Sequence, residues 1–88
     1  MNLPYIQTEL FRELVGIETL LEPECSLLIK KYISGNMNVC VWSGKKECFI
    51  LGTNIITYSI TTYDQITAEI NRIWKEIPDE CKRDDLLK

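Results

Sequence analysis

Residues 39–51, VCVWSGKKECFIL, decide the fold, because they form the densest run of apolar and β-favouring side chains in the chain. The polar segment SGKK, residues 43–46, divides this run and predicts a tight turn. Strands are therefore expected over residues 37–43 and 47–51. A connection this short cannot hold a parallel crossover, so the two strands should pair antiparallel.

Further strands are expected on both sides of this hairpin. Residues 25–33 lie between Pro23 and Gly35, which are typical helix boundaries, but the segment leads directly into a clear strand. A strand is the favoured interpretation there, with a helix as the alternative. Residues 52–54 predict another turn, and the alternating β-branched residues 55–61 predict a last strand. The strands should form a meander.

Two amphipathic helices are expected to flank the meander. Residues 3–21 carry apolar side chains at intervals of three and four, and Pro23 should end that helix. A second stripe of isoleucines follows Thr62, where the segment Thr62-Tyr63-Asp64-Gln65 has the spacing of a capping box. Pro78 should end this second helix.

The fold class follows from this order of elements. The sequence predicts a single α+β domain over residues 1–88, in which an antiparallel three- to four-stranded meander and the two helices form a two-layer sandwich. Residues 79–88 are expected to be a charged tail or a short helical turn.

Composition limits the classes of protein to which this chain can belong. The chain has 88 residues and a net charge of −3, with a mildly basic middle and acidic flanks. No apolar run approaches the ~20 residues of a membrane span, and the first residues lack the pattern of a signal peptide, so a cytoplasmic protein is expected. There is no histidine, no phosphate-binding glycine loop and no paired-cysteine motif. We therefore expect no enzyme, cofactor or metal site, and four reduced cysteines packed as small apolar groups: Cys25, Cys40, Cys48 and Cys81.

The central hairpin is apolar on both faces. Alternation places Val39 and Val41 on one face and Cys40 and Trp42 on the other. A two-residue loop would pair Cys40 with Phe49, and a three-residue loop would shift this pairing by one residue. Either register leaves both faces apolar, whereas a half-exposed sheet usually carries polar residues at alternate positions. Either one helix covers each face, or both helices cover one face and the other face is an interface, unless Trp42 packs under the chain termini.

The interface interpretation predicts a non-enzymatic protein-binding module that self-associates as a homodimer or masks a partner's surface. The isoleucine-rich composition is typical of AT-rich coding, and a small domain without motifs whose sheet is apolar on both faces is typical of phage and mobile-element accessory proteins. An anti-CRISPR-like inhibitor of a host protein is the most concrete version. A structural homo-oligomerisation domain is an alternative. The expected contact residues are Tyr32, Trp42, Lys45 and Lys46, with Phe11 and Val15 as a second patch.

A nucleic-acid-binding regulator is the other alternative. The order helix, three strands, helix resembles that of double-stranded-RNA-binding domains, and four lysines fall near the strands and turns: Lys30, Lys31, Lys45 and Lys46. Those domains carry lysines at the start of the last helix, where this chain has Asp64. Tyr32 and Trp42 could stack on bases, but the acidic balance of the whole chain disfavours binding to phosphates.

Overall fold

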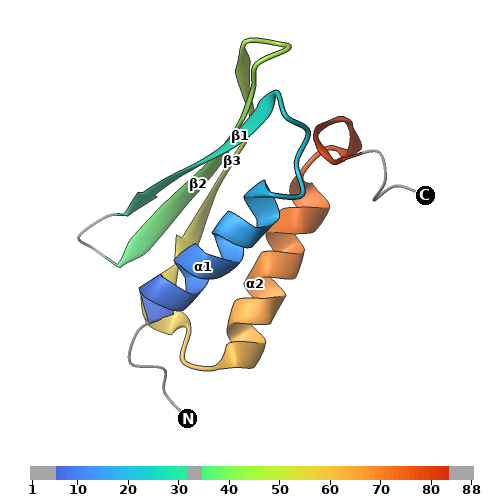
Figure 1. The fold of residues 1–88 in the computed structure, drawn as a ribbon. Coiled ribbons are helices and arrows are strands. Elements are labelled where there is room, and N and C mark those ends of the chain that lie inside the picture. The colour runs from blue at the N-terminus through green and yellow to red at the C-terminus, as the bar shows by residue number, and fades with distance from the viewer. Residues whose placement is uncertain (1–5, 32–34, 84–88) are drawn as a thin grey trace.

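The computed structural model describes residues 6–31 and 35–83 and confirms the α+β class (Figure 1). An N-terminal helix is followed by an antiparallel meander and a second long helix. In chain order the elements are α1 (Ile6–Glu18), β1 (Cys25–Lys31), β2 (Asn36–Ser43), β3 (Cys48–Ile56), the 3-10 turn η1 (Thr57–Ser59), α2 (Tyr63–Glu76) and the 3-10 turn η2 (Asp79–Cys81).

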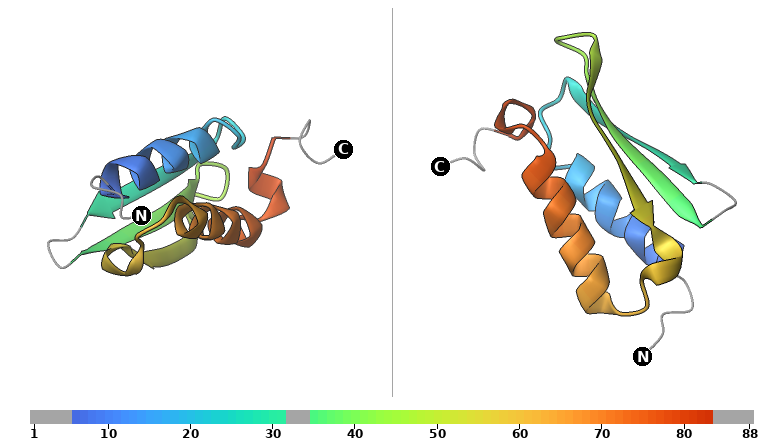
Figure 2. Two further views of the ribbon diagram at one scale, coloured as in Figure 1. Left: turned by 90° about the horizontal axis from the view of Figure 1, so that it is seen from below. Right: turned by 180° about the vertical axis from the view of Figure 1, so that it is seen from behind.

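Both long helices pack on the same face of the sheet. The strand order is β1-β2-β3, and burial alternates strictly along β2, where Met37, Val39, Val41 and Ser43 are buried. The two helices lie side by side against this inner face (Figure 2). The predicted two-layer arrangement is therefore correct, and no described helix covers the outer face of the sheet.

The core forms between the helices and the inner face. The spacing of three and four residues gives α1 one buried stripe and α2 another, because a helix repeats every 3.6 residues. The buried side chains of this core are Leu10, Leu14, Ile17, Leu21, Leu27, Met37, Val39, Val41, Ile55, Ile60, Ile66, Ile73, Ile77 and Cys81.

The predicted turn at residues 52–54 is wrong, because β3 continues through this segment to Ile56. The Asn38 amide donates to the Thr53 carbonyl at 3.2 Å and to Asn54 Oδ1 at 3.0 Å. Arg72 on α2 donates to Thr53 Oγ1 at 3.1 Å. Residues such as Thr53 and Asn54 are typical of a turn. These contacts provide hydrogen-bond partners for their polar groups within the strand.

The predicted fourth strand at residues 55–61 is also wrong, so the sheet has three described strands. After Ile56 the chain enters the 3-10 turn η1, where the Thr57 N–H donates to the Gly35 carbonyl at 2.8 Å. Tyr58 is 73% exposed and Ile60 is buried, so the alternation of a strand is lost.

The hairpin register differs from both predicted registers. Residues 44–47 form a four-residue turn, and Glu47 has a positive φ of 54°. Ser43 then pairs with Cys48 and Trp42 with Phe49, but a bulge shifts the pairing so that Val41 faces Leu51. An extra residue on one strand is what defines a β-bulge, and the local twist increases there.

The N-terminal helix is shorter than predicted. α1 ends at Glu18 rather than at residue 21, and Leu21 instead forms an isolated antiparallel bridge with Lys82. The N-terminal part of the predicted helix, residues 3–5, lies outside the described residues, as do residues 32–33 of the predicted first strand. Within the described part of that segment the strand interpretation is confirmed by β1.

The second helix begins and ends as predicted. The Thr62 hydroxyl accepts a hydrogen bond from the Gln65 N–H at 3.2 Å, while the Gln65 side chain accepts from the Thr62 N–H at 3.1 Å. This reciprocal pair is the predicted capping box. After Pro78, η2 provides the short helical turn that was one of the two expectations for the tail, and residues 84–88 lie outside the described part.

Candidate functional site

The outer face of the sheet carries a cluster of apolar side chains that we call the outer patch: Leu28, Cys40, Trp42 and Phe49. Leu28 is 46% exposed and Phe49 is 56% exposed, and Trp42 and Cys40 are half-buried. The rings of Trp42 and Phe49 meet edge to face, with centroids 5.0 Å apart and an angle of 75° between their planes. This edge-to-face geometry is favourable for aromatic pairs.

Strand pairing and the bulge assemble the patch. β2 is the central strand, so Trp42 lies between Ser26 on β1 and Phe49 on β3. Because the bulge adds a residue to β3 between the partners of Trp42 and Val41, Phe49 faces outward beside Trp42. A strand without the bulge would place a different residue of β3 beside the indole.

Amide side chains form a polar boundary at the other end of the outer patch. The Cys40 thiol donates to Asn38 Oδ1 at 3.1 Å, and the Asn38 amide donates to Asn54 Oδ1 at 3.0 Å. These three side chains satisfy one another on the surface. The face therefore changes from apolar to polar between Cys40 and Asn38.

Charge is unevenly distributed between the sheet and the helices. The strands contain Lys30 and Lys31 but no aspartate or glutamate, whereas most of the described acidic residues lie on the helices and their flanking loops. Lys45 is exposed in the hairpin turn. Lys46 Nζ forms an ion pair with Glu80 Oε1 at 2.7 Å, and this hydrogen bond and the charge of Glu80 raise the pKa of Lys46. Lys46 is thus already held by a carboxylate of its own chain.

A second apolar feature, the edge groove, lies between α1 and β1. It has a volume of about 180 Å³ and is lined by Phe11, Val15, Glu18, Leu27, Leu28 and Ile29. Phe11 and Val15 are 45% and 44% exposed, so they do not widen the core stripe of α1. Glu18 Oε2 accepts the Leu27 N–H at 2.9 Å, which satisfies one donor of this edge strand.

Leu28 belongs to both the outer patch and the edge groove. Three expected contact residues lie in these two features, with Trp42 in the outer patch and Phe11 and Val15 in the edge groove, whereas Lys45 and Lys46 lie in the hairpin turn. Tyr32 lies outside the described residues. Leu28 and Phe49 were not among the expected contact residues, although strand alternation in residues 25–31 places Leu28 on the outer face.

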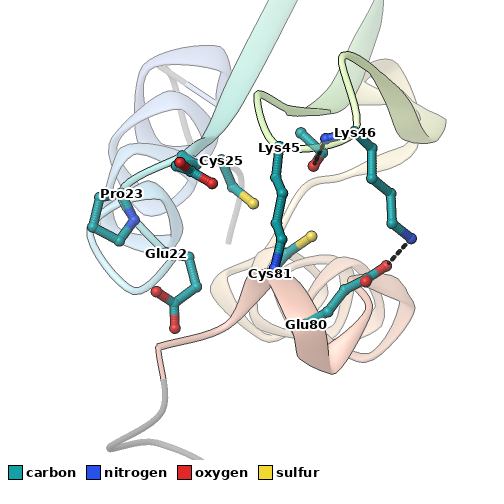
Figure 3. A pocket seen from close by; sticks show the side chains of 9 residues that line it. Glu22, Pro23, Cys25, Lys45, Lys46, Glu80 and Cys81 are labelled. Atoms are coloured by element: carbon teal, nitrogen blue, oxygen red, sulfur yellow. Dashed lines mark hydrogen bonds and ion pairs between the residues drawn. The ribbon is translucent and has the colours of Figure 1, made fainter.

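A larger cavity of about 560 Å³ lies at the end of the sheet next to the hairpin turn (Figure 3). It is lined by Glu22, Pro23, Glu24, Cys25, Ser43, Lys45, Lys46, Glu80 and Cys81. Cys81 is buried, and this burial and the neighbouring Cys25 side chain raise the pKa of the Cys81 thiol to about 12.

The outer patch and the edge groove are apolar surfaces, and the larger cavity contains two free thiols. Within residues 6–31 and 35–83, no three histidine, cysteine, aspartate or glutamate side chains are grouped so that they could hold a metal ion. In the same described part, none of the helices has the length and apolar character required to cross a membrane. Comparisons with protein-family models, curated proteins and solved structures found no match to this chain.

Proposed function

We propose that this protein is a non-enzymatic protein-binding module whose contact surface is the outer patch, extended around the sheet edge by the edge groove. The observation that carries the proposal is the exposure of Leu28 and Phe49 beside Trp42 on a sheet face that no described helix covers. Contiguous apolar surface of this kind is typical of interaction sites, and aromatic residues are enriched among the residues that dominate binding energy.

The chemistry of the patch indicates the chemistry of its partner. The centre is apolar and aromatic, Lys30 lies on the same face, and the strands contribute no carboxylate. A partner surface with an apolar centre and an acidic rim would complement this arrangement. Occupying such a surface is sufficient for an inhibitor that masks its target, and no catalytic group is required.

Nucleic acid is a weaker candidate for the same face. Stacking on Trp42 or Phe49 would be compatible with single-stranded binding. However, such binding draws its affinity from several cations that neutralise phosphates, and Lys46 is already paired with Glu80. We therefore favour a protein as the partner.

The test is a comparison of two alanine variants in affinity capture from lysate of the native host. Phe49→Ala removes an outer-patch ring, and Tyr63→Ala removes a ring of nearly equal exposure, 56% against 57%, on α2. We expect wild type and Tyr63→Ala to retain the same protein, or to self-associate to the same extent in light scattering, and Phe49→Ala to lose this binding.

The opposite pattern would contradict the proposal. Equal retention by both variants would show that the outer patch is not the contact surface. A nucleic acid that is retained by wild type, released steeply by salt and lost in Lys30→Ala would favour the alternative.

A further inference from the structure

Cys25 and Cys81 both line the cavity at the end of the sheet. Figure 3 shows both sulfur atoms in this cavity, and Cys25 is one of the neighbours that raise the pKa of the Cys81 thiol. Cys25 is half-buried at the start of β1, and Cys81 is 1% exposed at the end of η2. Both are free thiols in this structure.

The backbone around the two cysteines is fixed by hydrogen bonds. The Glu22 N–H donates to the Cys81 carbonyl at 2.8 Å, and the Cys25 N–H donates to the Glu22 carbonyl at 2.9 Å. Leu21 pairs with Lys82, so the two segments run antiparallel at this point. Glu22 therefore connects both cysteines through its own peptide groups, and their side chains project from a common frame.

The Lys82 side chain holds the same segment from the other side. Its ammonium lies 4.6 Å from the centroid of the Trp74 ring and 3.4 Å from Asp79 Oδ1. A cation placed over an aromatic ring is attracted by the negative face of the ring. These contacts hold the segment after α2 against α2, while the Glu22 hydrogen bonds hold it close to the start of β1.

We propose that Cys25 and Cys81 are a reversible dithiol–disulfide site, which a low-molecular-weight disulfide such as oxidised glutathione closes and a thiol reductant opens. The half-buried Cys25, as its thiolate, attacks one sulfur of the oxidant, which forms a mixed disulfide and releases one glutathione thiol. Cys81 then loses its proton and attacks the Cys25 sulfur, which releases the second glutathione thiol. In total, two protein thiols are oxidised and one disulfide is reduced to two thiols.

The accessibility of Cys25 and the burial of Cys81 match the order in which the two thiols react. Exchange begins at the sulfur that the oxidant can reach, and Cys25 is more accessible than Cys81. Cys81 remains a neutral thiol at ordinary pH, because burial raises its pKa. It would become reactive only when an oxidised Cys25 sulfur is already adjacent. Closure would join the start of β1 to the segment that follows α2.

Intact mass measurement after treatment with oxidised glutathione tests this assignment. We expect the protein to lose the mass of two hydrogen atoms and to yield, on digestion, one cross-linked peptide pair that contains Cys25 and Cys81. The melting temperature should rise by roughly 10 °C or more, because the bond closes a long loop of the unfolded chain. A thiol reductant should reverse both changes.

Two cysteine variants control the experiment. Cys25→Ser should abolish the cross-link and the stabilisation, and since Cys25 is only half-buried this variant should fold. Cys48→Ser removes an exposed thiol that does not line the cavity and should leave both effects unchanged. Glutathione adducts alone, a bond between other cysteines or four unmodified thiols would each overturn the assignment. Binding through Phe49 is measured separately, so the failure of one proposal can be distinguished from failure of the other.

Discussion

Replacing Phe49 with alanine should cost less stability than truncating a fully buried phenylalanine. A fully buried phenylalanine that is truncated to alanine loses about 3–5 kcal/mol. Phe49 is 56% exposed, so its truncation removes less than half as much buried apolar surface. Its edge-to-face contact with Trp42 adds about 0.5–1.5 kcal/mol. We therefore expect Phe49→Ala to lower the free energy of unfolding by about 2–3.5 kcal/mol.

Ile73 provides the comparison, because it is 0% exposed and is one of the core residues of α2. Ile73→Ala should cost about 2–5 kcal/mol, through lost burial and the cavity that remains. Urea unfolding followed by far-ultraviolet circular dichroism measures both values without relying on the fluorescence of Trp42. A Phe49→Ala loss of about 4–5 kcal/mol, as for a fully buried phenylalanine, would refute the reasoning, since it would mean that the outer face is covered.

Three further predictions concern the helix cap, the glycines and the buried thiol. Thr62→Ala removes the capping box and should lower the free energy of unfolding by about 1 kcal/mol in urea unfolding. Gly44→Ala should lower the melting temperature, because an added Cβ would lie 2.9 Å from the Glu24 carbonyl oxygen. Gly16→Ala, which meets open space within α1, should instead add about 0.5–1 kcal/mol. Finally, the free energy of unfolding should fall as the pH rises from 9 toward 12, because the Cys81 thiol has a pKa of about 12 when folded against 9.0 unfolded. In Cys81→Ala this part of the pH dependence should disappear.

Local patterns predicted those parts of the fold that depend on neighbouring residues. The alternation in residues 37–43 identifies the buried face of β2, because side chains of a strand project to opposite sides in turn. The capping box at Thr62 fixes the start of α2, because both of its hydrogen bonds lie within four residues. Elements of this kind can be read from the sequence alone.

Long-range contacts decided the parts that local patterns missed. The polar residues 52–54 are typical of a turn, but Asn38 and Arg72, which are distant along the chain, satisfy them within β3. The hairpin register depends on a bulge beside Val41 and on the positive φ of Glu47. Neither feature has a distinct sequence signal here, since positive φ most often indicates glycine or asparagine.

The sequence likewise predicts some residues of the candidate sites but not the contacts that bring them together. Alternation identifies Trp42 as a residue of the second sheet face, and helical spacing places Phe11 and Val15 at the flank of α1. The contact between these regions runs through Leu28, at the edge of the sheet, and only the packing of α1 beside β1 reveals it. The placement of Cys25 and Cys81, which are distant along the chain, in one cavity likewise requires the tertiary structure.

Site-specific photo-crosslinking tests the central claim most directly. A photoreactive phenylalanine analogue is placed at Phe49 in the outer patch, or at Tyr63 on α2 as the matched exposed control, and each protein is irradiated in lysate of the native host. The account predicts a discrete protein adduct, either with a partner or with a second copy of this chain, from position 49 and not from position 63. Equal adducts from both positions, an adduct from position 63 alone, or an adduct with nucleic acid at position 49 would contradict it.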